Sequence, residues 1–178
     1  MNDVVVAIGT NLGNRHEFML NAETAILNLP ESSHFLFSSI YQSVPINCDT
    51  TSPVYLNAVV KFTTRLTPYK LLELLQQIEN ANERERPYFN APRTLDLDVI
   101  LFGNHILSNP KLTVPHRLMH ERFFVLTPIC EIAPNLCHPI LEKNMLKLES
   151  SLMDKEKFIT LSTEQFVSNM TGSVAKTY

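Results

Sequence analysis

A short apolar run near the N-terminus places the strongest constraint on the fold. Residues 4–8 read VVVAI, with no polar side chain among them, so a strand formed by this segment must be covered on both of its faces. A helical pattern follows, with Asn14 as a cap and Glu17 three residues later. The apolar stripe of that helix recurs at spacings of three, four and three, at Met19, Ala22, Ile26 and Leu29. The chain therefore predicts a buried strand followed by an amphipathic helix.

Strands and helices continue to alternate along the chain. Further strands are expected at residues 35–41, 55–62 and 95–102, and a second helix begins after Thr67 and Pro68, with Leu71, Leu74, Leu75 and Ile78 on its apolar side. The order βαββαβ favours an α+β, ferredoxin-like sandwich with helices packed on one face of an antiparallel sheet. Beyond it we expect short helices at 122–126 and 128–132, and an amphipathic helix carrying Leu141, Met145, Leu148 and Leu152.

Composition limits the classes of function. With 178 residues, 44% of them hydrophobic, the chain suits one compact domain over residues 1–160 and a weakly patterned tail over 161–178. A net charge of -3 gives no global attraction for nucleic acid or anionic membranes. No apolar run has a membrane-spanning length and no leader pattern is present, so we expect a cytoplasmic protein. Cys48, Cys130 and Cys137 are expected to be free thiols.

Two carboxylates stand in the most informative strand. Asp96 and Asp98 alternate with Leu95, Leu97, Val99 and Leu101, which predicts both acids on one face, together with Ile100 and Phe102. Neighbouring negative charges on an apolar strand are stabilised by a cation, and such hard oxygen ligands suit Mg²⁺. The alternative is a strand end in solvent, with Asp96 capping a turn and Arg93 pairing with it.

Basic residues gather on both sides of this acidic pair, at Arg84, Arg86, Arg93, Lys111, His116, Arg117 and Arg122. Guanidinium groups bind phosphate oxygens in a bidentate way, so the cluster indicates a polyphosphate site. The glycine-rich loop of the common NTPases is absent. Because Glu83 and Glu85 interleave with two of the arginines, a solvated loop is the alternative there.

Three weaker patterns complete the list of candidates. His116 and His120 are spaced for a zinc site but lack a specified third ligand, so a phosphate contact or a surface role is the alternative. Residues 9–13, GTNLG, favour a tight turn between strand and helix. Tyr55 and Asn57 share a strand face, where a ring can stack and a carboxamide can both donate and accept; packing and solvation are the alternative.

The motifs together resemble one family over about the first 140 residues. In order they read AIGTNLG at 7–13, YLNA at 55–58, PRTLDLD at 92–98, LTVPH at 112–116 and EIAP at 131–134. This pattern is similar to that of the 6-hydroxymethyl-7,8-dihydropterin pyrophosphokinases. The resemblance implies ATP-dependent pyrophosphoryl transfer to the pterin alcohol in folate biosynthesis, with two Mg²⁺ ions on Asp96 and Asp98. Separately, we expect the chain to be a monomer.

The resemblance also implies roles for individual residues. Those on the pterin side are Ser43, Ile46, Tyr55, Asn57 and Phe124. Those on the ATP side are Gln76, Glu79, Arg84, Arg93, Lys111, Thr113, His116 and Arg122, and the catalytic group comprises Arg84, Arg86, Arg93, Asp96 and Asp98. Arg117, beside His116, is a further ATP-side candidate that the resemblance does not itself imply.

Two departures from the family pattern bear on the catalytic loop. Bacterial members commonly read RWGPRT before the acidic pair, whereas residues 89–94 here read FNAPRT and the loop is one residue shorter. A loop arginine and an aromatic lid residue are thus absent, and Arg117 stands where a tyrosine is usual. A regulatory module that binds nucleotide or pterin without turnover, and a metal-dependent phosphohydrolase, therefore remain alternative functions.

Overall fold

The structure, a computed structural model, describes residues 1–43, 54–82 and 94–152. The first half of this part contains β1 (Asn2–Thr10), α1 (Arg15–Leu27), β2 (Ser32–Phe37), β3 (Tyr41–Ser43), β4 (Tyr55–Thr64) and α2 (Pro68–Ala81). The second half contains β5 (Asp96–Phe102), β6 (Leu107–Ser108), β7 (Thr113–Val114), a 3-10 turn at Met119–Glu121, α3 (Phe123–Ile132) and α4 (Met145–Ser150).

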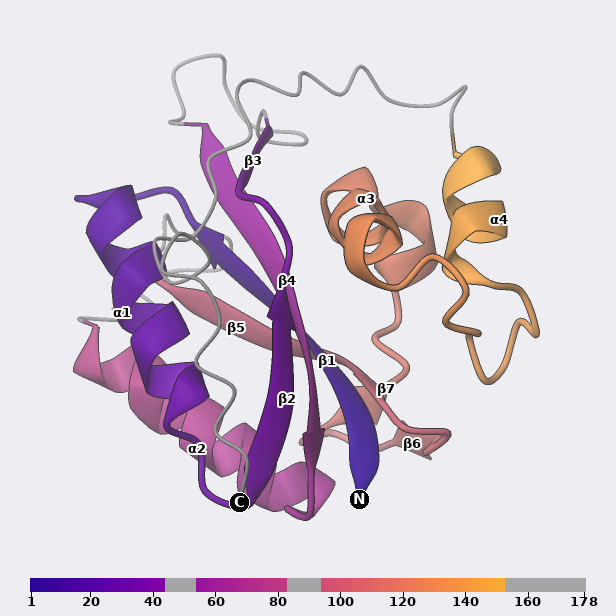
Figure 1. The fold of residues 1–178 in the computed structure, drawn as a ribbon, viewed down its shortest axis with the longest axis horizontal. Helices are drawn as coiled ribbons and strands as arrows, with labels where there is room; N and C mark the ends of the chain where they lie inside the picture. The colour runs from indigo at the N-terminus through magenta and orange to yellow at the C-terminus, as the bar shows by residue number, and fades with distance from the viewer. Residues whose placement is uncertain (44–53, 83–93, 153–178) are drawn as a thin grey trace.

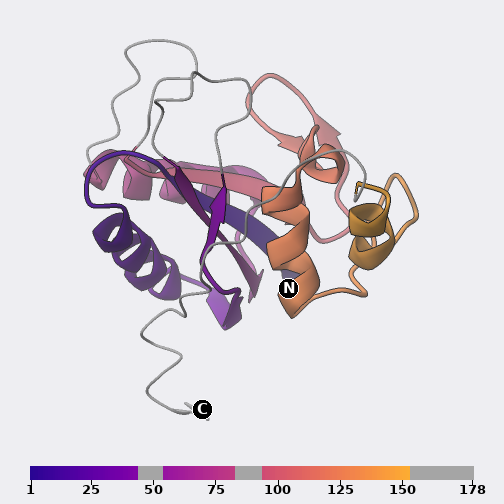
Figure 2. The same ribbon diagram turned by 90° about the horizontal axis from the view of Figure 1, so that it is seen from above.

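The main sheet confirms the predicted architecture. Its order is β2-β4-β1-β5 with antiparallel pairing throughout, and β3 continues the β2 edge along the first residues of β4. This is the ferredoxin-like order expected from βαββαβ. Helices α1 and α2 cover one face, and α3 and α4 cover part of the other, so helices are not confined to one face (Figure 1; Figure 2). None of the helices in the described part of the chain has the length and apolarity needed to cross a membrane.

Strand β1 separates two hydrophobic cores, as its unbroken apolar sequence predicts. Val4, Val6 and Ile8 lie in the core under α1 and α2, whereas Val5 lies in the core under α3 and α4. All four side chains are at most 1% exposed. Burying a side chain of this size stabilises the fold by about 1.5–3 kcal/mol, so covering both faces favours this strand at the middle of the sheet.

A β-bulge changes the predicted faces of β5. Leu97 and Val99 lie in the core under α1 and α2, as expected, and Ile100 lies in the opposite core. The register with β1 then shifts between Val5 and Val6, so Leu101 joins Ile100 and Phe102 crosses to the α1 and α2 side. The prediction for Leu101 and Phe102 was therefore wrong, because one extra residue in a strand reverses the alternation beyond it.

Local signals set most helix boundaries. The Asn14 and Thr67 side chains cap α1 and α2 as predicted. The two short helices expected around Pro128 form the single helix α3, because the apolar face around Val125 and Ile129 is buried and offsets the missing N–H of proline. Helix α4 begins only at Met145, capped by Asn144, so the expected start near Leu141 was wrong.

Helix α1 also buries a carboxyl group that the apolar pattern does not predict. Glu23 is 3% exposed, and burial raises its pKa to about 7. Because this pKa lies above the usual 4.5, the stability linked to Glu23 is fully present below pH 4.5 and is lost as the pH rises through 7. We expect Glu23→Gln to raise the melting temperature by several degrees at pH 8 and to change it little at pH 4. Thermal unfolding at both pH values checks this, and an equal shift at the two values would contradict it.

Other sequence expectations fall partly outside the described residues. Cys130 and Cys137 are free thiols, as expected, whereas Cys48 lies outside the described part. The tail at 161–178 also lies outside it. The division at residue 160 therefore stays a prediction.

Candidate active site

Three neighbouring strands bring predicted site residues into one row. In the register of the sheet, Gly9 of β1 lies opposite Asn57 of β4 on one side and opposite Asp96 of β5 on the other. Residues paired in this way project to the same face of a sheet. With strands spaced about 4.8 Å apart, the row spans about 10 Å. A carboxamide and a carboxylate thus face the same space from its two sides.

Gly9 forms the floor of this row. It lies within β1 rather than in the predicted turn, and only Gly13 of that motif has a positive φ, of 66°. A Cβ atom at Gly9 would lie 3.8 Å from Asn57 Oδ1, in the space between the two polar side chains. A glycine inside a strand is typical of a place where a ligand approaches the backbone closely.

The Asn57 end of the row is held by the edge strand. Asn57 Nδ2 donates a 2.8 Å hydrogen bond to Ser43 Oγ, and both residues are buried. This bond orients the amide, so its oxygen lies on the Gly9 side. Tyr55 pairs with Ser43 on the same face and is half-buried, as is Phe124 in the first turn of α3. The structure therefore brings Asn57, Ser43 and Tyr55 together, and their assignment to a substrate pocket stays a prediction.

The acidic end of the row consists of two half-buried carboxylates on one sheet face. Asp96 pairs with Gly9, and Asp98 pairs with Ala7 two residues along β1. Between them, Leu97 N donates a 2.7 Å hydrogen bond to Glu79 Oε1, so the predicted ATP-side residue Glu79 is buried and holds the backbone of β5. Two carboxylates on one face, one of them opposite Gly9, suit Mg²⁺, which usually keeps several waters and phosphate oxygens besides one or two carboxylates.

His116 and Arg122 lie near the acidic end. Burial, with Arg122 and Arg117 nearby, lowers the pKa of His116 to about 4, although the Asp96 carboxylate opposes this shift. The imidazole is therefore neutral at pH 7. Arg122 lies over the Phe124 ring, 5.5 Å from its centroid, so a basic group and an aromatic group meet at the start of α3. Arg117 is exposed.

The remaining ATP-side candidates are more scattered. Thr113 lies half-buried in β7, Lys111 is exposed just before it, and Gln76 is exposed on α2. Ile46, Arg84, Arg86 and Arg93 lie outside the described residues.

The zinc alternative receives no support from the described part of the chain. His116 precedes the 3-10 turn rather than sharing a helix face with His120, which packs against His138 with ring centroids 6.1 Å apart. Among the described residues, no group of three or more His, Cys, Asp or Glu side chains could hold a metal ion.

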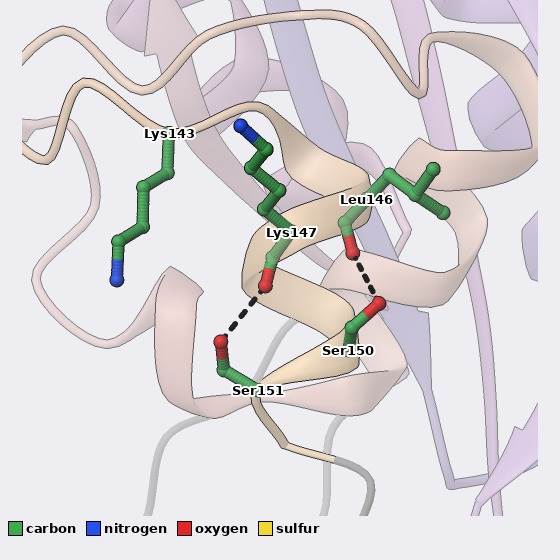
Figure 3. A pocket seen from close by; sticks show the side chains of 5 residues that line it. All are labelled: Lys143, Leu146, Lys147, Ser150 and Ser151. Carbon is green, nitrogen blue, oxygen red and sulfur yellow. Dashed lines mark hydrogen bonds between the residues drawn. The ribbon is translucent and has the colours of Figure 1, made fainter.

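A hollow of about 400 Å³ lies elsewhere, on α4, and none of the predicted site residues lines it. Its walls are Lys143, Leu146, Lys147, Ser150 and Ser151 (Figure 3). The two serine hydroxyls donate to the backbone carbonyls of Leu146 and Lys147 at 2.8 Å each. Both hydroxyl protons are thus engaged within the helix.

Sequence reasoning missed two features of the site. The register places Gly9 between Asn57 and Asp96, and the signal for it was a glycine at the end of an apolar strand. Glu131 of α3 contacts the edge strand that carries Ser43, through Ser39 and Tyr41. The sequence signal was an acidic residue near a helix C-terminus, where the helix dipole disfavours a negative charge, which indicates a compensating contact for Glu131.

Comparison with known proteins supports the family that the sequence motifs resemble. Residues 5–134 match the family model 7,8-dihydro-6-hydroxymethylpterin-pyrophosphokinase (HPPK). The 2-amino-4-hydroxy-6-hydroxymethyldihydropteridine pyrophosphokinase of Haemophilus influenzae is 44% identical over 134 residues, which cover 75% of this chain and 83% of the relative. The protein of the same name from Pseudomonas aeruginosa is 41% identical over 136 residues, or 76% and 83%.

Solved structures agree on the fold. A Plasmodium falciparum HPPK-DHPS A437G chain with SDX-DHP matches with a TM-score of 0.68 at 13% identity, over 86% of this chain and 46% of that chain. This chain therefore spans less than half of that longer protein, and the likeness concerns the fold alone. The family match and the bacterial relatives carry the assignment further: the chain belongs to the 7,8-dihydro-6-hydroxymethylpterin-pyrophosphokinase family.

Proposed function

We propose that the chain transfers a pyrophosphoryl group from ATP to 6-hydroxymethyl-7,8-dihydropterin in folate biosynthesis, giving the pterin diphosphate and AMP. The observation that carries this proposal is the row in which Gly9 separates the Asn57 carboxamide from the Asp96 carboxylate. One end suits a heterocycle with hydrogen-bonding edges, and the other suits a metal-bound phosphate. Family membership supports the same reaction.

The pterin is placed at the Asn57 end. Because Ser43 accepts one proton of the Asn57 amide, the amide oxygen is directed to accept from a donor on the pterin edge. Tyr55 and Phe124 are the aromatic residues proposed to stack on the bicycle. The Ile46 backbone contact implied by the family resemblance is part of the same proposal.

Asp96 and Asp98 would hold Mg²⁺, and we propose two ions. Bound Mg²⁺ supplies a lower pKa to the attacking hydroxyl and offsets the charge of the phosphates. The two carboxylates fit this task because they are half-buried and share a face, and Asp96 lies opposite the glycine of the neighbouring strand.

The transfer exchanges one phosphorus–oxygen bond for another. The hydroxymethyl oxygen of the pterin attacks the β-phosphorus, the bond from that phosphorus to the oxygen bridging to the α-phosphorus breaks, and AMP leaves with that oxygen. The proton of the hydroxyl passes to water, since no described residue stands out as a general base. Catalysis then rests mostly on positioning and charge stabilisation.

The basic residues would act on the triphosphate. Arg122 carries a positive charge near His116, and His116 offers a neutral hydrogen-bonding ring until a phosphate raises its pKa. Arg84, Arg86 and Arg93 are proposed to bring further charge from the loop before β5. Gln76, Glu79, Lys111 and Thr113 are proposed to complete the ATP side.

An assay of nucleotide products distinguishes the three candidate functions. With Mg²⁺ and ATP, we expect AMP to form only when 6-hydroxymethyl-7,8-dihydropterin is present. Phosphate release without the pterin would indicate a phosphohydrolase. Binding of both ligands without AMP would indicate a regulatory module. We further propose that the protein is cytoplasmic and that its active species is a monomer. Light scattering after gel filtration measures the molar mass and so tests the monomer.

Arg117 provides a separate prediction. It is exposed beside His116, in the segment proposed to contact ATP, and the family usually has a neutral tyrosine there. If it replaces the absent loop arginine, Arg117→Tyr should lower kcat about tenfold with little change in pterin affinity. Steady-state kinetics of Arg117→Tyr alone checks this prediction. The double variant that also carries Phe89→Arg restores a loop charge and should recover activity. Normal turnover by Arg117→Tyr would contradict the prediction and mean that Arg117 is a surface residue without a role in catalysis.

A further inference from the structure

The edge of the sheet beside the pterin end is interrupted, and a carboxylate from α3 occupies the interruption. Strand β2 ends at Phe37 and β3 begins at Tyr41. Within the gap, Ser39 N donates to both carboxylate oxygens of Glu131, at 3.1 and 2.9 Å, and Ser39 Oγ donates to Glu131 Oε1 at 2.8 Å. Tyr41 OH donates to Glu131 Oε2 at 2.8 Å. The carboxylate thus satisfies a backbone donor that lies between the two strands.

The chemistry of these contacts favours a specific connection. An acid near the C-terminus of a helix is disfavoured by the helix dipole, and Glu131 is the ninth residue of a ten-residue helix. Hydrogen bonds to a charged acceptor are about twice as strong as neutral ones. Burial and the Glu131 carboxylate both raise the pKa of Tyr41, so its hydroxyl stays protonated and remains a donor. The hydrogen bonds from Ser39 and Tyr41 therefore offset the unfavourable interaction of the Glu131 carboxylate with the helix dipole.

The connection leads directly to the pterin end of the site. Tyr41 lies opposite Asn57 in the sheet register, and Ser43, two residues further along β3, accepts from the Asn57 amide. The other end of α3 carries Phe124, with Arg122 above its ring. Glu131 thus ties the helix that presents Phe124 to the strand that orients Asn57.

From this geometry we infer that Glu131 is a positioning residue, which acts through Tyr41 and β3 to hold the Asn57 amide and Phe124 in register for the heterocyclic substrate. The inference rests on the proposed function. It predicts a larger effect on pterin binding than on ATP binding, because Asp96 and Asp98 lie on β5, whose backbone Glu79 holds, and Arg122 is the ATP-side candidate that adjoins α3.

Two substitutions, each of which removes one hydroxyl group from a hydrogen bond that involves α3, provide a matched test of this inference. Tyr41→Phe removes the hydroxyl bonded to Glu131, whereas Thr127→Val removes the hydroxyl that donates to Glu149 Oε1 of α4 at 2.6 Å. Each deletes one carboxylate–hydroxyl bond of the same helix, but only the first leads to β3. We expect Tyr41→Phe to raise the pterin KM and Kd about threefold and Thr127→Val to leave both unchanged, even if both lower the melting temperature.

Glu131→Ala and Glu131→Gln complete the series. We expect the alanine variant to raise the pterin Kd about tenfold and to change the ATP Kd far less, and the glutamine variant, which keeps one acceptor oxygen, to restore part of the pterin affinity. Isothermal calorimetry with each ligand separately, at one pH and salt concentration, measures these values. If Tyr41→Phe and Thr127→Val change pterin binding equally, or if ATP binding weakens in parallel, Glu131 is only structural. Absence of pterin binding by the unsubstituted protein would overturn the proposed function instead.

Discussion

Asp96→Ala and Asp98→Ala should each lower kcat about a hundred- to a thousandfold while the fold survives. Each substitution removes an oxygen ligand from the pair that suits Mg²⁺, and the loss of one well-placed charge-stabilising group in an active site commonly reduces kcat by about 10²–10³. Removing one of two like charges on a sheet face also relieves repulsion, so the fold is not expected to suffer. AMP formation at saturating Mg²⁺, with circular dichroism for folding, tests both parts.

Asp3→Ala is the matched control for this prediction. Asp3 is also an aspartate on the sheet, but it forms a 2.8 Å salt bridge with Lys61 and its side chain is 48% exposed. Exposed ion pairs contribute about 0–1 kcal/mol, so this variant should turn over normally. Near-normal AMP formation by both Asp96→Ala and Asp98→Ala would refute the metal assignment.

Asn57→Ala should weaken pterin binding by about 1–3 kcal/mol, which is roughly 5- to 160-fold, and leave ATP affinity nearly unchanged. The reason is the position of the carboxamide at the far end of the row from Asp96, with Gly9 between them. Calorimetry with each ligand separately measures the two affinities. An equal loss for ATP would mean that Asn57 supports the sheet and does not bind the pterin.

Two companion variants separate recognition from structure at this position. Ser43→Ala removes the acceptor that orients the amide, so we expect a smaller loss of pterin affinity than for Asn57→Ala. Asn21→Ala deletes an amide that donates to Asn82 Oδ1 at 3.1 Å, away from the row. It should alter stability without changing either affinity, and a loss of pterin affinity in it would point to a general effect of amide removal.

Much of the fold could be predicted because it follows from short-range patterns. The apolar run at residues 4–8, the caps at Asn14 and Thr67 and the alternation in β4 each depend on residues close together in the sequence. Side chains two apart in a strand and three or four apart in a helix must share a face. The same rule placed Asn57 with Tyr55, and Asp96 with Asp98, before any pairing was known.

The errors arose where a partner element changes the local pattern. The bulge in β5 exists only relative to β1, so the side on which Leu101 and Phe102 are buried depends on pairing. Proline was expected to divide α3, but packing of Val125 and Ile129 holds one helix through Pro128. Burial of Glu23 was also missed, because an acidic residue within an amphipathic helix is normally assigned to the solvent side.

The sequence by itself determined the order of elements, the pairs of side chains that share each strand face, and, through its motifs, the family. Only the tertiary structure decided which of those pairs meet. The sheet register sets Gly9 between Asn57 and Asp96, and the packing of α3 brings Glu131 to Ser39, 92 residues away in the chain. The physical reason is that periodicity specifies only the direction of a side chain from its own backbone. Distances between side chains on different elements follow from strand pairing and core packing, in which the whole chain takes part.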